Sequence, residues 1–153
     1  MKVLNIIPYW GVKYGGPFIN AVNLSNYFTQ AGNETALLST IRNNEKNAEN
    51  KLIAGINYPS FLSDCIRNED FICFSPGFSA KFRRISVDYD VVLIHGFWRF
   101  PMTYAARYCR KKNIPYFIFT HGQLSRWSLS VSRVRKTIYY FLFLRRDLSA
   151  AKA

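Results

Sequence analysis

The sequence opens with a strand, a helix and a second strand within its first 39 residues. The apolar, β-branched run at 2–7 is typical of a buried strand, and 34–39 is the next such run. Between them, apolar residues recur at helical spacing over 18–31, with Pro17 suited to the first helical position and Gly32 to the end. A strand–helix–strand unit this short requires parallel strands joined by a right-handed crossover.

The same alternation returns later in the chain. The runs 90–94 and 115–119 are typical of strands, and a helix is expected between them over 102–112. Strands and helices in alternation predict an α/β fold, a Rossmann-like, doubly wound sheet of parallel strands. One core is enough for a chain of 153 residues, so 1–153 is expected to form a single domain.

Other stretches are harder to assign. The polar residues 42–51 include four asparagines and are typical of a loop. Short strands are expected at 53–58 and 71–74, and a short helix at 78–85. Toward the end, 132–150 is expected to form a single helix with basic ends around an apolar middle.

The positive charge is concentrated in the second half of the chain. The net charge is +12, and residues 1–80 contribute none of it, because their six basic and six acidic residues cancel. A half this basic attracts anionic partners such as membrane surfaces, nucleic acid or phosphorylated substrates. The alternative is a solvated basic face without a dedicated partner.

Composition excludes several classes of protein. An apolar fraction of 49% excludes a disordered tail. No apolar run approaches the roughly 20 residues that a membrane-spanning helix needs. The first residues lack the pattern of a signal peptide, and the three cysteines form no CxxC pair. These features predict a soluble cytoplasmic protein with reduced thiols.

Glycine residues and the two histidines of the chain follow three of the expected strands. Gly15 and Gly16 precede the first helix, where a backbone without side chains and a helix N-terminus can receive an anion. Their loop has neither the Rossmann fingerprint nor the lysine of a P-loop, so a plain turn is the alternative.

His95 and His121 each stand at the end of an expected strand and before a glycine. Ligands of such sheets bind at the carboxyl ends of the strands, so the pair is expected to face a ligand. A hydrogen-bonded structural histidine is the alternative for either one alone. No third ligand is evident near them, so neither a metal nor a cofactor is expected. A GxSxG nucleophile is also absent from the sequence.

In their order along the chain, these motifs resemble the N-terminal domain of GT-B-fold retaining glycosyltransferases, the large family that includes sucrose synthases and many bacterial polysaccharide glycosyltransferases. The resemblance covers nearly the whole chain except 42–88. The segments that carry it are Val3–Pro8, Tyr14-Gly15-Gly16-Pro17, Asn23-Leu24, Asp90–Ile94 with His95-Gly96-Phe97-Trp98, Asn113–Tyr116, Thr120-His121-Gly122-Gln123-Leu124 and Arg145–Ala151.

The resemblance implies transfer of a sugar from a nucleotide-sugar donor, with retention of configuration and without an essential metal, in polysaccharide biosynthesis. It places Gly15 and Gly16 against the donor diphosphate and makes His121 the catalytic residue beside the donor sugar. It places His95, Phe97 and Trp98 at the acceptor, a glycan or a lipid-linked molecule.

The resemblance extends to the first, acceptor-side domain of the family only. The sequence has no Glu-x7-Glu spacing, so the C-terminal donor-binding domain is expected to be absent and the chain truncated. Catalysis of this class needs groups from both sides of a closed cleft, so the chain alone is expected to be inactive. A second chain is the expected source of the missing half.

The basic half then favours a lipid-phosphate acceptor and a peripheral position at the inner face of the membrane. The apolar side chains at 138–143 would be partly covered in a whole enzyme and are expected to be exposed here, with an ordinary packed helix as the alternative. Two other functions stay open. One is a basic α/β module that binds anionic membrane or nucleic acid, although no nucleic-acid-binding motif is present, and the other is a non-functional fragment.

Overall fold

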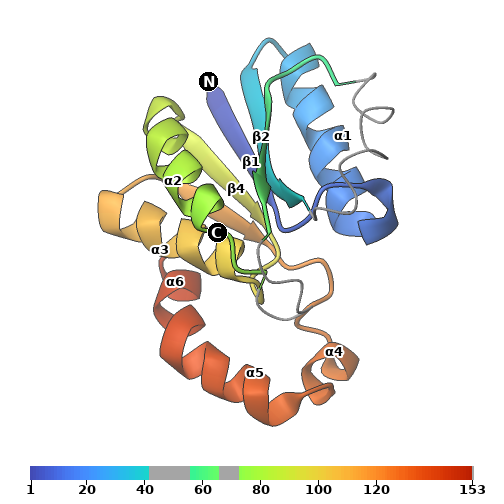
Figure 1. Ribbon diagram of the computed structural model, residues 1–153, viewed down its shortest axis with the longest axis vertical. Coiled ribbons are helices and arrows are strands. Elements are labelled where there is room, and N and C mark those ends of the chain that lie inside the picture. The colour runs from blue at the N-terminus through green and yellow to red at the C-terminus, as the bar shows by residue number, and fades with distance from the viewer. Residues whose placement is uncertain (42–55, 66–72, 153) are drawn as a thin grey trace.

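The computed structural model describes residues 1–41, 56–65 and 73–152 (Figure 1). Within these residues, five parallel strands form one sheet in the order β3-β2-β1-β4-β5. The strands are β1 (Lys2–Ile7), β2 (Glu34–Ile41), β3 (Ser60–Asp64), β4 (Val91–His95) and β5 (Tyr116–Phe119). The predicted α/β, Rossmann-like sheet of parallel strands is confirmed.

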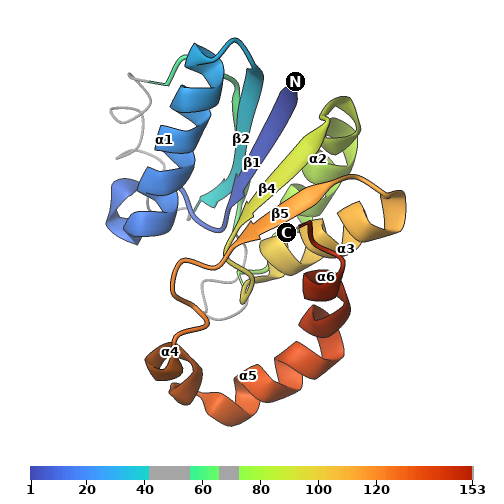
Figure 2. The ribbon, with the colours of Figure 1, turned by 180° about the vertical axis from the view of Figure 1, so that it is seen from behind.

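Helices cover both faces of the sheet, as a doubly wound fold requires. Helix α1 (Gly16–Gln30) packs on one face, while α2 (Pro76–Ile85) and α3 (Phe100–Lys112) pack on the other (Figures 1 and 2). Short 3-10 turns, η1 (Val12–Tyr14) and η4 (Ser86–Asp88), precede α1 and follow α2.

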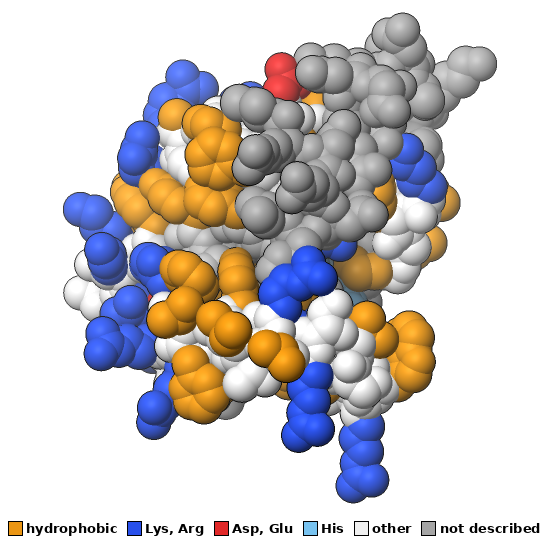
Figure 3. Space-filling model, turned by 60° about the horizontal axis from the view of Figure 1, so that its bottom comes forward, with side chains coloured by type: hydrophobic (Ala, Val, Ile, Leu, Met, Phe, Trp, Pro, Cys, Tyr) orange, Lys and Arg blue, Asp and Glu red, His pale blue; other side chains and the backbone are white. Residues whose placement is uncertain are grey.

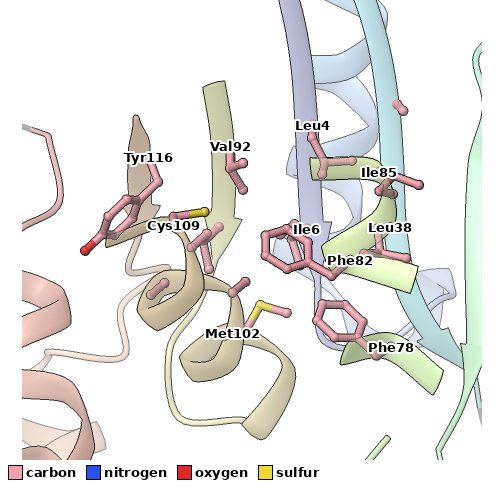
Figure 4. Close-up of a cluster of buried hydrophobic side chains, with 14 residues drawn as sticks. Leu4, Ile6, Leu38, Phe78, Phe82, Ile85, Val92, Met102, Cys109 and Tyr116 are labelled. Atoms are coloured by element: carbon pink, nitrogen blue, oxygen red, sulfur yellow. The ribbon is translucent and has the colours of Figure 1, made fainter. Parts of the chain in front are cut away.

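The larger core lies between the sheet and helices α2 and α3. Side chains alternate between the two faces of a strand, so Ile6 of β1 and its neighbour Ile94 of β4 point to the same side. There they join Phe78 and Phe82 of α2 and Met102 of α3 in one buried cluster (Figure 4). Asn5 and His95, one residue away in each strand, point to the other face, which α1 covers.

The predicted strands at 53–58 and 71–74 differ from what the structure contains. Residues 53–55 and 71–72 lie outside the described residues. Tyr58 is not in a strand, because β3 begins two residues later. Its side chain packs in the core on the side of the sheet that α1 covers. Phe74 forms a single β-bridge and no longer strand, and Cys73 beside it has a left-handed φ of 47°. The predicted helix at 78–85 is confirmed, and the Ser75 side chain caps its start by accepting a hydrogen bond from the Phe78 N–H.

The helix predicted at 132–150 is confirmed, because α5 (Arg133–Tyr139), the π-helical turn η5 (Tyr140–Leu144) and α6 (Arg145–Ser149) follow one another without a gap. A short helix that was not predicted, α4 (Arg126–Ser130), precedes them, and we call the four segments together the C-terminal arm. Ser132 separates α4 from α5 with a left-handed φ of 56°. Figures 1 and 2 show the arm as an arc beyond the carboxyl ends of the strands.

The arm is attached to the rest of the molecule through its inner side. Leu144 is buried against Phe97 and Trp98, and the buried Asp147 accepts a hydrogen bond of 2.7 Å from Arg110 of α3. The outer side is different, because Trp127, Phe141 and Leu142 are 79%, 63% and 65% exposed. The expected exposure of the apolar side chains at 138–143 is therefore confirmed for most of them. None of the described helices has the length and apolar character to span a membrane.

Candidate functional site

The three loops singled out in the sequence meet at one edge of the sheet. Strands β1, β4 and β5 are neighbours, so their carboxyl ends lie side by side. The loop with Gly15 and Gly16 follows β1, His95 closes β4, and His121 follows β5. The prediction that both histidines stand at this edge is confirmed.

His95 and His121 are hydrogen-bonded to each other. Nδ1 of His95 lies 2.9 Å from Nε2 of His121, and the two rings are inclined by only 18°. His95 also stacks on Phe119, its neighbour in β5, with ring centroids 4.9 Å apart. His95 is fully buried, while His121 is partly exposed. Of the two rings, His121 is therefore the one that a ligand can reach.

Behind the histidine pair, polar side chains continue into the protein. Nε2 of His95 lies 3.1 Å from Oδ1 of Asn5, and Nδ2 of Asn5 donates to the hydroxyl of Ser25 on α1 at 2.9 Å. All three side chains are fully buried. A buried polar group without a partner is costly, and here each one has partners.

Both histidines are held neutral. Burial, together with the nearby His121, lowers the pKa of His95 to about 3. Burial also lowers the pKa of His121. An uncharged imidazole has one N–H donor and one acceptor nitrogen, so the pair can exchange only one hydrogen bond in one direction.

Gln123 joins the loops that follow β4 and β5. Its Oε1 accepts a hydrogen bond of 3.2 Å from the N–H of Phe97. Gly96 has φ of 93°, and a Cβ there would lie 2.9 Å from Nε2 of Gln123. The positive φ therefore favours glycine at 96, and a Cβ there would also displace the end of the Gln123 side chain.

A cavity of about 220 Å³ adjoins the Gly15–Gly16 loop. Its lining includes Tyr14 and Pro17 on either side of the glycines, together with Arg99 and Gln123 from the loops after β4 and β5. The Arg99 guanidinium donates to the Tyr9 hydroxyl at 3.3 Å and lies over the Tyr9 ring. Gly15 has φ of 71°, and nothing lies within 4 Å of a Cβ built on either glycine. The cavity therefore contains a cation, and the residues on either side of the two glycines line it.

Phe97 and Trp98 line a second, larger cavity of about 520 Å³ between the sheet edge and the arm. Three basic residues, Arg126, Arg133 and Lys136, also line it, and Lys136 lies over the Trp98 ring. In Figure 3 this end of the molecule carries hydrophobic side chains among many Lys and Arg. The cavity thus offers apolar surface beside positive charge.

The described residues offer few other groups for catalysis. They contain no cluster of three or more His, Cys, Asp or Glu side chains suited to a metal ion. Burial raises the pKa of the Cys109 thiol to about 12, which disqualifies it as a nucleophile.

Three residues of the site were missed in the sequence. Asn5 breaks an otherwise apolar strand, and that interruption was the available signal. Arg99 and Gln123 stand in loops right after the two histidine motifs, but nothing in the sequence indicates that they turn toward the first loop.

Residues 14–153 match the model of Glycosyltransferase Family 4. The chain belongs to glycosyltransferase family 4. The match confirms the resemblance to glycosyltransferases, while retention of configuration is a finer statement that it leaves untested.

Solved structures with a similar fold include two from bacteria. A UDP-N-acetylglucosamine 2-epimerase from Listeria monocytogenes has a TM-score of 0.52 at 13% identity, over 76% of this family 4 chain and 30% of its own. MurG from Acinetobacter baumannii has a TM-score of 0.50 at 22% identity, over 82% of this family 4 chain and 38% of its own. The family 4 chain thus spans about a third of the length of these proteins. A comparison with curated protein sequences found no match.

Proposed function

We propose that this chain is the acceptor-side half of a family 4 glycosyltransferase that moves a sugar from a nucleotide-sugar donor to a lipid-linked acceptor, with retention, in polysaccharide biosynthesis. The observation that carries the proposal is the joined pair His95–His121 at the carboxyl edge of the sheet, beside an open glycine loop. The family match supports the reaction class.

His121 is the residue proposed to act on the donor sugar. It is partly exposed, uncharged and fixed by its hydrogen bond to His95. His95, being fully buried, acts behind His121 and meets a substrate only if the site opens. A group held in place before the reaction contributes to catalysis because no reorganisation is needed when charge develops.

The donor diphosphate is proposed to lie against Gly15 and Gly16. Their backbone is open to solvent, and α1 begins at Gly16, so its positive end faces an anion there. Arg99 in the adjoining cavity supplies a full positive charge. These features are independent of each other and favour the same ligand.

The acceptor is proposed to occupy the cavity lined by Phe97 and Trp98. Apolar walls with Arg126, Arg133 and Lys136 among them suit a molecule with a hydrocarbon chain and a phosphate. This chemistry favours a lipid-linked acceptor over a neutral glycan. The same arm would rest on an anionic membrane, where exposed Trp127 and Leu142 enter the interface and the basic side chains meet lipid phosphates.

The donor-binding half is proposed to come from a second domain or chain. We expect this chain alone to transfer no sugar and expect transfer when it is mixed with the C-terminal domain of a family 4 glycosyltransferase. The assay follows radiolabelled sugar from a panel of nucleotide sugars into polyprenyl phosphates. In the active mixture, His121→Ala should lower kcat by about 10²-fold or more, in line with the loss of one preorganised catalytic group. Thr35→Val, buried in β2 away from the site, is the control and should retain activity. Transfer that survives His121→Ala would refute the role of His121.

Membrane binding is tested by co-sedimentation with anionic and neutral liposomes. We expect binding to the anionic ones, reduced by Arg126→Gln/Arg133→Gln and unchanged by Arg83→Gln/Arg84→Gln on the exposed side of α2. Equal binding to both kinds of liposome would refute the electrostatic attraction. Binding of nucleic acid in preference to anionic liposomes would favour the alternative of a basic binding module.

A further inference from the structure

The hydrogen bonds of the histidine pair belong to a longer series that ends on a backbone carbonyl. We call it the polar chain, and its members are Tyr58, Ser25, Asn5, His95 and His121, with the carbonyl of Val22 in α1 as its end. The polar chain runs from α1 across the middle strand of the sheet to the loop after β5. Its two ends are therefore held by different layers of the fold.

The Asn5 amide gives the polar chain a direction, because its nitrogen can only donate and its oxygen can only accept. At the far end a carbonyl oxygen can likewise only accept, so the Tyr58 hydroxyl donates to the Val22 carbonyl, at 3.4 Å. Burial raises the pKa of Tyr58, and a hydrogen bond with Ser25 opposes that rise. The Ser25 oxygen accepts from the Asn5 amide nitrogen.

The same direction continues through Asn5 to the histidines. Nδ2 of Asn5 donates to Ser25 at 2.9 Å, which leaves Oδ1 of Asn5 to accept. Nε2 of His95, at 3.1 Å from that oxygen, therefore carries the ring proton, and Nδ1 of His95 is the acceptor. His121 must then donate from Nε2, at 2.9 Å.

The other ring nitrogen of His121, Nδ1, is left without a proton. With its proton on Nε2, neutral His121 has a lone pair on Nδ1, and within the described part of the chain no hydrogen bond to Nδ1 is present. Such a nitrogen accepts a hydrogen bond from a hydroxyl group. It cannot donate to a phosphate oxygen or to a leaving oxygen unless the ring gains a second proton.

We propose that Asn5 and Ser25 are positioning residues that fix His121 as the Nε2–H tautomer, so that its Nδ1 receives a hydroxyl group of a sugar. The identity of the sugar-bearing ligand rests on the proposed function, whereas the position of the proton does not. The spectrum of the histidine rings and the sugar-transfer assay can therefore fail separately.

The location of Asn5 supports a role beyond packing. It is the one polar residue within the apolar run Val3 to Ile7 and lies in β1, between β2 and β4, at the centre of the sheet. An aliphatic side chain there would leave Nε2 of the buried His95 without a partner. Thr35 provides the contrast: it is buried in the same sheet, but its hydroxyl has no hydrogen-bond partner among the residues that the structure describes.

The proton positions can be measured on this chain without any substrate. The sequence has only two histidines, so ¹⁵N-labelling of histidine gives two ring systems in a long-range ¹H–¹⁵N spectrum. Protonated and unprotonated ring nitrogens resonate far apart and identify each tautomer. We expect both rings to be neutral Nε2–H tautomers at pH 7. His121→Gln assigns the two systems. A Nδ1–H pattern for His121, or a mixture of tautomers, would overturn the proposal.

Variants test whether Asn5 and Ser25 are responsible. Asn5→Leu removes the oxygen that accepts from Nε2 of His95, so both histidine rings should become mixtures of tautomers. Asn5→Asp keeps an acceptor oxygen, so the proton should remain on Nε2 of His95. Ser25→Ala should give a smaller change, because Asn5 loses its partner but keeps its contact with His95. Thr35→Val is the matched control and should change neither ring.

The spectra of the variants separate positioning from general packing. If folded Asn5→Leu retains both Nε2–H patterns, or if Thr35→Val disturbs them as much, Asn5 does not position His121 and the proposal is overturned. If Asn5→Leu does not fold, Ser25→Ala and the spectrum of the unchanged chain decide. Failure of the transfer assay with an intact Nε2–H pattern would refute the proposed function but leave the proton arrangement standing.

Discussion

The polar chain and the C-terminal arm distribute their side chains in opposite ways. In the polar chain, the side chains of Ser25, Asn5 and His95 are fully buried although water would solvate them well, and each has hydrogen-bond partners from neighbouring elements. In the arm, large apolar side chains such as Trp127 and Leu142 are exposed. The buried part of the polar chain needs no further partner, because its polar groups satisfy one another. The arm exposes apolar surface of the kind that marks an interaction site.

Leu144 and Leu142 give the sharpest test of this comparison within the arm. Leu144 is 1% exposed and contacts Phe97 and Trp98, whereas Leu142 is 65% exposed. We expect Leu144→Ala to lower the free energy of unfolding by about 3 kcal/mol, from lost burial and the cavity left behind. Leu142→Ala should change it by less than about 0.5 kcal/mol. Urea denaturation measures both. Equal effects would mean that the arm is buried on both sides.

Acid should destabilise the fold through the histidines of the polar chain. The pKa of His95 is lowered from 6.5 to about 3, so the unfolded chain binds a proton that the folded one refuses. Its contribution to stability is full above pH 6.5 and is lost as the pH falls toward 3. Between pH 7.5 and 4.5 this amounts to about 2.5 kcal/mol. His121, whose pKa is also lowered, acts with the same sign.

The control for this pH dependence is His95→Asn, measured by urea denaturation across the same range. The variant should be less stable at neutral pH, but its stability should fall less steeply toward pH 4.5. A slope as steep as that of the unchanged chain would show that His95 is not the group responsible.

Asp147 should be the main polar attachment of the arm. Its buried carboxylate faces Arg110 at 2.7 Å and Arg107 at 3.8 Å. Asp147→Asn keeps the shape but removes the charge, and we expect a loss of about 2 kcal/mol, which is typical of a hydrogen bond to a charged group. Asp88→Asn, at an exposed carboxylate, should change stability by less than about 0.5 kcal/mol. Thermal unfolding followed by circular dichroism compares the two, and similar losses would contradict the role of Asp147.

Gly96 should respond to a methyl group more than Gly16 does. Gly96→Ala places a Cβ 2.9 Å from Gln123 at a positive φ of 93° and disturbs the bond from Gln123 to Phe97. We expect a loss of about 1 to 2 kcal/mol. Gly16 has open space around it, so Gly16→Ala should leave stability nearly unchanged while testing the proposed diphosphate contact. Urea denaturation measures both, and equal losses would show that Gln123 does not restrict Gly96.

The sheet could be predicted because its strands carry their signal locally. The run at 2–7 matches β1 from end to end, and the helices that follow are marked by Pro17, Pro76 and Pro101 near their starts. The histidine pair could be placed because parallel strands bring their ends to one edge. These features follow from periodicity and topology, which a single sequence contains.

The remainder depends on contacts between residues that are distant in the sequence. Strand β3 lies at the edge of the sheet and pairs with β2 alone, so its short run at 60–64 carries little apolar signal. Asn5 and His95 are 90 residues apart, and only the fold reveals that they meet. The π-helical turn at Tyr140–Leu144, within the predicted helix, has no glycine or proline to mark it. Arg99 and Gln123 likewise join the first loop through tertiary contacts.

The π-helical turn at Tyr140–Leu144 has a consequence for how the arm can vary between relatives. A π turn takes one residue more than an α turn, and each residue rotates an α-helix by about 100°. Deleting one residue there would keep α5 and α6 but turn one about its axis relative to the other. A different set of side chains would then face outward, while Leu144 and Asp147 stayed attached to the body. A single insertion or deletion at this turn can therefore change what the arm presents to a partner without altering the core.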